Sequence, residues 1–130
     1  MRLHDFAAWR AARELAADVY RTTRGEAFAT DATLRLEMRD RAATIMTSLA
    51  AAYEHHDCGG FRESLRTACG AAAELDSLLF LARDADLLAE AGAGSLHRKV
   101  AEVRRQVLSV ERAALRYEGI VDLDAEETAS

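Results

Sequence analysis

The feature that most constrains the fold is a row of apolar residues near the C-terminal end, spaced alternately four and three positions apart. The row consists of Leu96, Val100, Val103, Val107, Val110, Ala114 and Tyr117. Apolar residues at this heptad spacing form the seam along which helices wind around one another. Ser95 before the row predicts an N-cap, and Gly119 after it predicts the end of the helix. The spacing therefore predicts a helix that packs lengthwise in a helical bundle.

Three further segments have apolar residues at helical spacing, and the sequence contains no proline. The predicted helices cover about residues 5–24, 31–56 and 58–83, in addition to 95–118. Short connections between them favour antiparallel neighbours. The sequence thus predicts an all-α, antiparallel up-down-up-down four-helix bundle in a single domain. The acidic segment 119–130 is expected to be disordered.

Each predicted helix has one stripe of residues that is expected to face the core. Asp5, Asp31 (or Thr30) and Asp57 are predicted to cap the first three helices, and Gly25 to end the first. The predicted stripes consist of Phe6, Trp9, Ala12, Leu15, Ala16, Val19 and Tyr20 in the first helix, Leu34, Met38, Ala42, Ile45, Leu49 and Ala52 or Tyr53 in the second, and Phe61, Leu65, Ala68, Ala72, Leu75, Leu79 and Ala82 in the third.

Twelve consecutive residues between Arg41 and Glu54 carry no formal charge, in a chain of which 30% is charged. A helix without charges on any face is buried on most sides, and no helix of a four-helix monomer is buried in that way. The segment 67–73 is also uncharged and consists of small residues, which allow helices to approach closely. We therefore expect a contact with another copy of the chain. The predicted interface residues are Ala43, Met46, Thr47, Ala50, Ala51, Gly70 and Ala71.

The net charge of −5 is concentrated at the C-terminal end, where four acidic residues follow Glu118 without any Lys or Arg. The rest of the chain has a formal charge of −1 and lacks the basic excess of a general polyanion binder. A local basic stripe is nevertheless predicted, because Arg98, Arg105 and Arg112 are spaced by seven on one helix face. This stripe is interpreted either as a solvated outer face or as a surface for phosphates. The N-terminus lacks an apolar leader and no apolar run could span a membrane, so we expect a cytoplasmic protein with reduced thiols.

The segment Glu54–Cys58 is the only cluster of side chains that could bind a metal ion. Its candidates are consecutive and therefore point in different directions, unlike the spaced ligands of a zinc site. Cys58 could act as a nucleophile only with an oriented base and an oxyanion site, neither of which the sequence indicates. Cys69 is interpreted as a buried structural thiol. We expect no enzyme activity, no metal and no cofactor, and keep a metal or enzyme role of His55, His56 and Cys58 as a third hypothesis.

Three stretches resemble the four-helix-bundle family of 23S rRNA intervening-sequence proteins. The first helix has the family's aromatic residue, Trp, Ala, Leu and Val-Tyr pair at Phe6, Trp9, Ala12, Leu15, Val19 and Tyr20. Residues 45–52 align with the family's Ile-Pro-Ser-Asn-Ile-Ala-Glu-Gly-like signature, with Met46 at the proline, Ser48 at the Asn and Ala51-Ala52 at the Glu-Gly. Phe61, Gly70 and Ala73-Glu74-Leu75 match the third helix. The resemblance extends from about Asp5 to Tyr117.

This resemblance implies a left-handed antiparallel four-helix bundle that assembles into a homopentameric ring, and it implies no catalytic residues. A related branch, the accessory variability proteins of diversity-generating retroelements, partners a reverse transcriptase and binds nucleic acid through a basic surface. Our leading hypothesis is therefore a self-assembling, non-enzymatic bundle. A nucleic-acid-binding or reverse-transcriptase accessory module that uses Arg98, Arg105 and Arg112 is the alternative.

Overall fold

The computed structural model describes residues 2–55 and 58–129, together with their side chains except those of Cys58 and of residues 117–129. All regular structure in these residues is helical, which confirms the predicted all-α class. The elements are η1 (Leu3–Asp5), α1 (Ala7–Thr22), α2 (Glu26–Ala29), α3 (Ala32–Glu54), α4 (Cys58–Asp84) and α5 (Glu90–Ala129).

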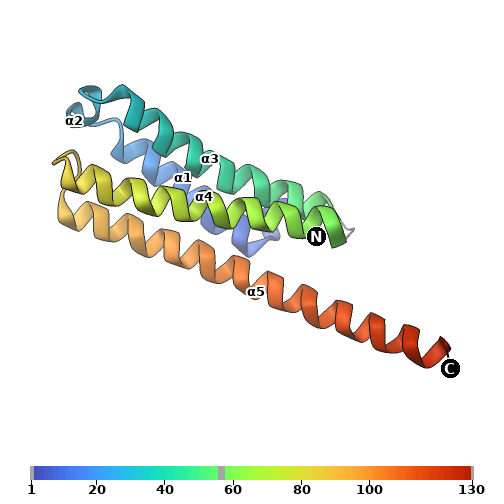
Figure 1. Cartoon of the computed structure of the whole chain (residues 1–130). Helices are drawn as coiled ribbons and strands as arrows, with labels where there is room; N and C mark the ends of the chain where they lie inside the picture. Colours follow the sequence, from blue (N-terminus) through green and yellow to red (C-terminus); the bar gives the residue numbers. More distant parts are fainter. Residues whose placement is uncertain (1, 56–57, 130) are drawn as a thin grey trace.

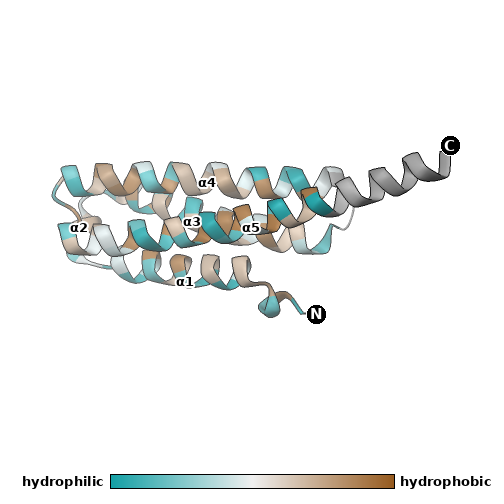
Figure 2. Cartoon of the chain, turned by 90° about the horizontal axis from the view of Figure 1, so that it is seen from below, coloured by the Kyte–Doolittle hydropathy of each residue, from teal (hydrophilic) through white to brown (hydrophobic). Residues whose placement is uncertain are grey.

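The four long helices α1, α3, α4 and α5 pack side by side, and the C-terminal part of α5 extends beyond the other three (Figure 1). Each contacts two of the others: α3 packs on α4 and α1, and α5 packs on α1 and α4. Apolar and polar residues alternate along each helix, so that every helix has an apolar side (Figure 2). None of the helices, within the described residues, combines the length and apolarity that a bilayer span requires.

The core lies between the apolar sides of these four helices. Leu34, Met38, Ile45 and Leu49 of α3 are at most 5% exposed, as predicted. The heptad row of α5 is buried from Leu96 to Val107 and half-buried at Val110 and Ala114; Tyr117 lies outside the described side chains. The predicted core stripes are thus largely confirmed. The buried hydrophobic residues are Ala8, Ala12, Leu15, Ala16, Val19, Phe28, Leu34, Met38, Ala42, Ile45, Leu49, Ala52, Leu65, Ala68, Ala71, Ala72, Leu75, Leu79, Ala82, Leu88, Ala93, Leu96, Val100, Val103 and Val107.

The aromatic residues of the predicted stripes lie nearer the surface than expected. Tyr20 is 41% exposed, so its assignment to the core is wrong. Its ring lies instead under the guanidinium of Arg39, with 4.6 Å between Cζ and the ring centroid. Phe6, Trp9 and Phe61 are half-buried at the edge of the core. A tyrosine can remain at the surface because its polar tip is hydrated while its ring packs on a neighbour.

One of the predicted N-caps is confirmed. The Asp31 carboxylate accepts a hydrogen bond of 3.0 Å from the backbone N–H of Leu34 and so caps α3. Asp5 does not cap α1, which begins after Phe6; its carboxylate accepts from the backbone N–H of Arg2, within the preceding turn. Asp57 lies outside the described residues.

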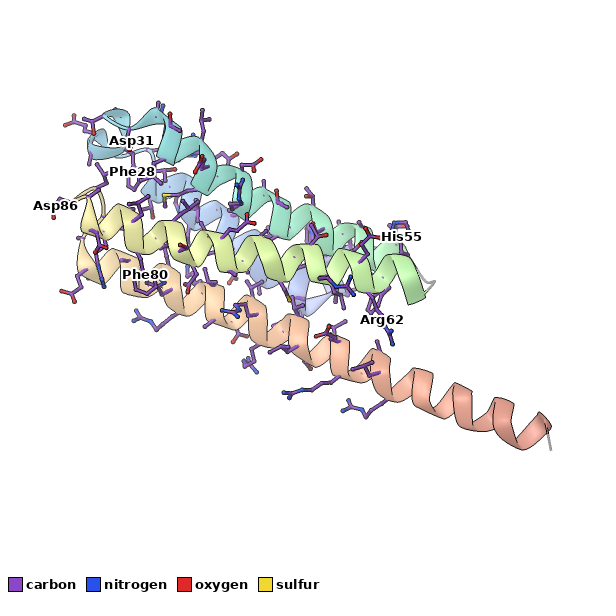
Figure 3. All side chains as sticks on the ribbon, viewed as in Figure 1. Phe28, Asp31, His55, Arg62, Phe80 and Asp86 are labelled. Atoms are coloured by element: carbon purple, nitrogen blue, oxygen red, sulfur yellow. The ribbon has the colours of Figure 1, made fainter. Side chains whose placement is uncertain are left out.

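The connection from α1 to α3 is more ordered than the sequence predicts. Thr23 is fully buried and donates its hydroxyl hydrogen to the carbonyl of Val19 at 2.7 Å. Arg39 of α3 donates to that hydroxyl oxygen at 2.7 Å, which ties α3 to the end of α1. The short helix α2 then places Phe28, 2% exposed, against the core at this end of the molecule (Figure 3).

The connection from α4 to α5 is shorter than predicted. Asp86 has a φ of 60°, and the bonds from Asp86 N to Arg83 O and from Leu87 N to Ala82 O close the end of α4. This is a Schellman motif with an aspartate at the position that usually holds glycine. Leu88 is buried in the core, and Leu87 packs against it.

Both predicted ends of the last helix are wrong. The helix α5 begins at Glu90, so Ser95 is not its cap, and Gly92 and Gly94 lie within the helix. A Cβ atom at Gly92 would lie 3.2 Å from Cδ1 of Leu88, so the glycine leaves room for this leucine. The helix also continues through Gly119 to Ala129, across the segment that was predicted to be disordered. One glycine in a helix costs only about 1 kcal/mol, and no proline follows to stop it.

Candidate functional site

A groove between α3 and α4 contains Thr44 from the uncharged stretch of α3, and Thr67, Gly70 and Ala71 from the uncharged stretch of α4. This α3–α4 groove has a volume of about 380 Å³. Its lining consists of Asp40, Arg41, Thr44, Thr67, Gly70, Ala71 and Glu74. Hydroxyls and small side chains therefore line the middle of the groove, and charged residues lie at one end.

Arg41 closes the charged end of the α3–α4 groove. Its guanidinium forms ion pairs with Glu74 across the groove and with Asp40 at 2.6 Å on its own helix. The hydrogen bond to Glu74 is the main reason why the pKa of Arg41 is raised above its ordinary value. The salt bridge joins α3 to α4 at the surface.

Gly70 is the least expected residue of this surface. It is exposed in the middle of α4, and a Cβ atom placed on it would meet nothing within 4 Å. The described glycines have no positive φ, so Gly70 is not required by its backbone conformation. A glycine costs a helix about 1 kcal/mol relative to alanine. No packing within the described part of the chain therefore accounts for it.

The seven predicted interface residues do not all lie on one surface. Thr47 and Gly70 are exposed, and Ala43, Ala50 and Ala51 are half-buried on α3. Met46 packs against the core, on the side of α3 away from the groove. Ala71 is 4% exposed and belongs to the core, so an arginine there would disrupt the monomer itself.

The predicted arginine stripe forms on α5. Arg98, Arg105 and Arg112 are all exposed and spaced by two helical turns. Arg105 pairs with Glu102 through two guanidinium nitrogens at 2.7–2.9 Å, which lowers the pKa of Glu102 below its ordinary value, with a smaller contribution from Gln106. Among the described residues, Arg98 and Arg112 have no ion pair. Two of the three arginines can thus bind an external anion or carboxylate.

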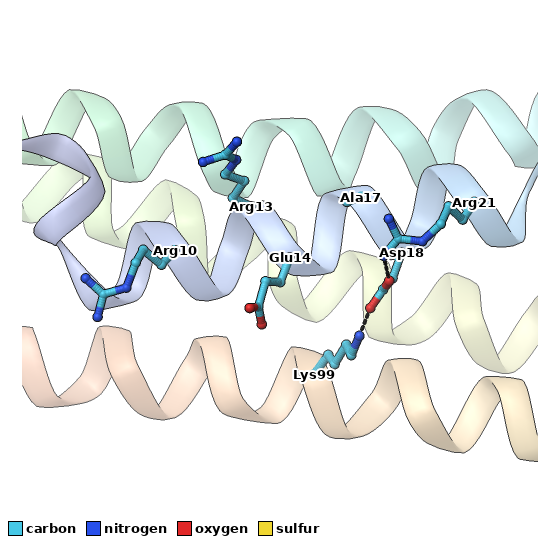
Figure 4. Close-up of a pocket in the computed structure, with 7 residues that line it drawn as sticks. All are labelled: Arg10, Arg13, Glu14, Ala17, Asp18, Arg21 and Lys99. Atoms are coloured by element: carbon cyan, nitrogen blue, oxygen red, sulfur yellow. Dashed lines mark hydrogen bonds and ion pairs between the residues drawn. The ribbon is translucent and has the colours of Figure 1, made fainter.

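A second groove, between α1 and α5, was not predicted. This α1–α5 groove has a volume of about 560 Å³ and is lined by Arg10, Arg13, Glu14, Ala17, Asp18, Arg21 and Lys99 (Figure 4). Asp18 is 15% exposed and pairs with both Arg21 and Lys99. The lining combines four basic side chains with two carboxylates, so the groove carries a net positive charge. The spacing of Asp18 and Arg21 is visible in the sequence, but their pairing with Lys99 depends on the packing of α1 on α5.

A histidine at the contact of α4 and α5 was also missed. The Nδ1 atom of His97 lies 2.6 Å from a carboxylate oxygen of Asp76, and its ring packs at 4.2 Å from the ring of Phe80, which Figure 3 labels on α4. The Nε2 atom of His97 is buried and has no hydrogen-bond partner. The pair joins α4 to α5.

The predicted metal and thiol candidates are only partly described. Glu54 and His55 are exposed, whereas His56, Asp57 and the side chain of Cys58 lie outside the described part. Within the described residues no three metal-binding side chains come together. Cys69 is half-buried, and burial is the main reason why its thiol pKa is raised. A protonated thiol is a poor nucleophile, which agrees with the structural interpretation of Cys69.

Comparisons with known proteins agree with this architecture. A solved structure of a protein of unknown function from the S23 ribosomal protein family of Bacteroides thetaiotaomicron has a TM-score of 0.71. It is 14% identical, and the match covers 80% of this chain and 94% of that one, which shows a shared fold. No curated protein matches the sequence.

The family model of the 23S rRNA-intervening sequence proteins matches residues 4–109, which include α1 to α4 and the first half of α5. The matched part includes both the α3–α4 groove and most of the α5 arginine stripe. The chain therefore belongs to the family of 23S rRNA-intervening sequence proteins.

Proposed function

We propose that this protein is a non-enzymatic helical protein that assembles with copies of itself, as a ring of five, in the cytoplasm. In this proposal the four packed helices form an antiparallel up-down-up-down bundle, and the α3–α4 groove is part of the contact between copies. The ring of five follows from the resemblance of the sequence to its family.

The observation that carries the proposal is the open space at Gly70. An exposed glycine in a helix is costly, and neither a backbone turn nor a neighbour in the described chain requires one here. A helix from a second copy that packs closely at this position would explain the glycine, because a glycine allows a partner helix to approach the backbone. Thr44 and Thr67, which line the groove with it, are also small enough for such an approach.

The test is the substitution Gly70→Arg. The monomer has room for the side chain, so its helices and fold are expected to persist, as measured by circular dichroism. The assembly is expected to dissociate, because the arginine fills the surface that the partner occupies. Light scattering should then give the 14.2 kDa mass of one chain, against five times this mass for the wild type.

The control is Ala85→Arg, which adds the same side chain at an exposed position after the end of α4 and away from the groove. This variant should keep the mass of the wild type. A wild-type chain that is monomeric at micromolar concentration would contradict the proposal.

Nucleic-acid binding through the arginine stripe, in an accessory role to a reverse transcriptase, is the second candidate function. It is supported by the exposure of Arg98, Arg105 and Arg112 on one face, which a ring would multiply. Binding to structured RNA should weaken as salt is raised and disappear in the variant Arg98→Glu/Arg105→Glu/Arg112→Glu. The absence of binding at low salt would exclude this candidate.

A further inference from the structure

The outer face of α5 has a second row of apolar residues, separate from the row that faces the core. Ala101, Leu108 and Leu115 are spaced by seven and are all exposed, the two leucines by 45% and 52%. Residues at this spacing form a continuous stripe along a helix, of the kind that packs against another helix. Within the described residues, the packing of α5 on α1 and α4 leaves this row uncovered.

Positive charges accompany this row. Arg98, Arg105 and Arg112 each lie three positions before one of its members, so the two stripes run in parallel. Together with Arg104 and Arg116, they give the exposed side of α5 five guanidinium groups against the two carboxylates of Glu102 and Glu111. A surface that combines exposed leucines with an excess of arginine fits a partner with small and acidic residues.

The surface around the α3–α4 groove combines small residues with acidic residues. Thr44, Thr67 and Gly70 provide a shallow hollow with room for a large side chain. Of the charged residues that line it, Asp40 and Glu74 both pair with Arg41, which leaves the lining with one negative charge in excess. About one helical turn before these lining residues, Glu37 on α3 and Glu63 on α4 are exposed, against the single guanidinium of Arg66.

The two surfaces also match in length. From Arg98 to Leu115 the helix extends over roughly 26 Å, and from Glu37 to Ala51 over roughly 21 Å, at 1.5 Å per residue. The leucines and arginines of the α5 surface therefore extend over about the same distance as the α3–α4 groove and the carboxylates beside it.

We propose that the exposed face of α5 in one copy packs into the α3–α4 groove of the next copy, with Leu108 next to Gly70. The inference rests on the proposed self-assembly and names the two surfaces that make the contact. Because the surfaces differ, the contact is heterologous, and each copy uses both of them. Repetition of a heterologous contact closes a ring when the rotation between copies permits it.

The first experiment compares the masses of two triple variants by light scattering. The variant Arg98→Glu/Arg105→Glu/Arg112→Glu reverses the α5 charges and should fall to 14.2 kDa, the mass of one chain. The matched control Arg2→Glu/Arg13→Glu/Arg24→Glu makes the same charge change at exposed positions near the N-terminus and should remain assembled. Circular dichroism establishes that both variants are folded.

The second experiment mixes the α5 triple variant with the Gly70→Arg variant at high micromolar concentration. The first retains an intact groove and the second an intact α5 surface, so one contact can form between them but no ring. The mixture should give twice the mass of one chain, whereas each variant alone should give a monomer. A mixture that remains monomeric would overturn the pairing of these two surfaces.

The outcomes separate this inference from the proposed function. A monomeric wild type contradicts self-assembly as such. An assembled α5 triple variant contradicts only the role of α5 in the contact, and if it has also lost RNA binding, the arginines serve nucleic acid instead.

Discussion

Asp86 is the one residue outside glycine that adopts a left-handed backbone conformation among the described residues, with a φ of 60°. Aspartate tolerates this region better than most residues, but glycine adopts it without steric cost. The substitution Asp86→Gly should therefore raise the free energy of unfolding by about 0.5–1 kcal/mol.

The measurement is urea unfolding of the wild type and the variant at equal protein concentration. The control Asp84→Gly places glycine in the last turn of α4, where it should lower the free energy of unfolding. Equal stability of the Asp86→Gly variant and the wild type would show that the aspartate is not strained.

Cys69 is expected to react slowly with alkylating reagents. Its pKa is raised first by burial and then by Glu111, with an opposing contribution from Arg104, so less thiolate is present near pH 9 than in the unfolded chain. The unfolded chain loses its thiol proton first, so this group favours folding below its unfolded pKa, and the contribution is lost as the pH rises through the folded pKa.

In a Cys58→Ser variant, iodoacetamide at pH 9 should modify the native protein more slowly than the urea-unfolded protein. The two rates should converge as the pH is raised further. A native rate equal to the unfolded rate at pH 9 would contradict the shift.

At the scale of the element, the caps show what local sequence can predict. Asp31 precedes a clear helical pattern and caps α3 as expected, because the bond from the Leu34 N–H involves only residues close in sequence. The substitution Asp31→Ala should lower the free energy of unfolding by about 1 kcal/mol, and Asp31→Asn should lower it much less. Thermal unfolding of the two variants measures the difference; equal losses would exclude a capping role.

The start of α5 could not be predicted in this way. Two glycines so close together, Gly92 and Gly94, are typical of a turn, yet both lie in α5. Leu88 packs over Gly92, and the spacing of the residues does not indicate this contact. Tyr20 was misplaced for a related reason, since its ring is covered by Arg39 from another helix. The spacing of apolar residues along one helix identifies its buried side. Contacts between helices decide whether a residue at the edge of that side, such as Tyr20, is buried.

The candidate surfaces also divide into those that lie on one helix, which the sequence predicts, and those that form between two helices, which it does not. The uncharged segments and the arginine stripe are visible in the sequence, because each lies on a single helix. The α1–α5 groove and the pair of His97 and Asp76 depend on which helices are neighbours, and nothing in the spacing of their residues indicates it. The burial of Ala71 was missed because a row of small residues has no marked apolar side.

At the scale of the whole molecule, stability comes from the shared core rather than from the grooves. Leu75 is fully buried between the helices, whereas Leu81 on the same helix is 54% exposed. The substitution Leu75→Ala should lower the free energy of unfolding by about 2–5 kcal/mol because it leaves a cavity. The matched change Leu81→Ala should alter it by at most about 0.5 kcal/mol, as surface substitutions generally do.

Chemical denaturation of both variants at one concentration provides the comparison. Similar losses for both leucines would contradict the assignment of the core.

The pairing of Asp18 with Lys99 joins the first long helix to the last. During synthesis, α3 and α4 are adjacent in sequence and can pack as soon as both have been made. The side of α1 that faces α5 has no such neighbour, and it is covered only after the α5 residues that pack on it, Lys99 among them, have left the ribosome. We therefore expect a chain that is released before this point to expose the apolar side of α1 and to depend on chaperones or be degraded.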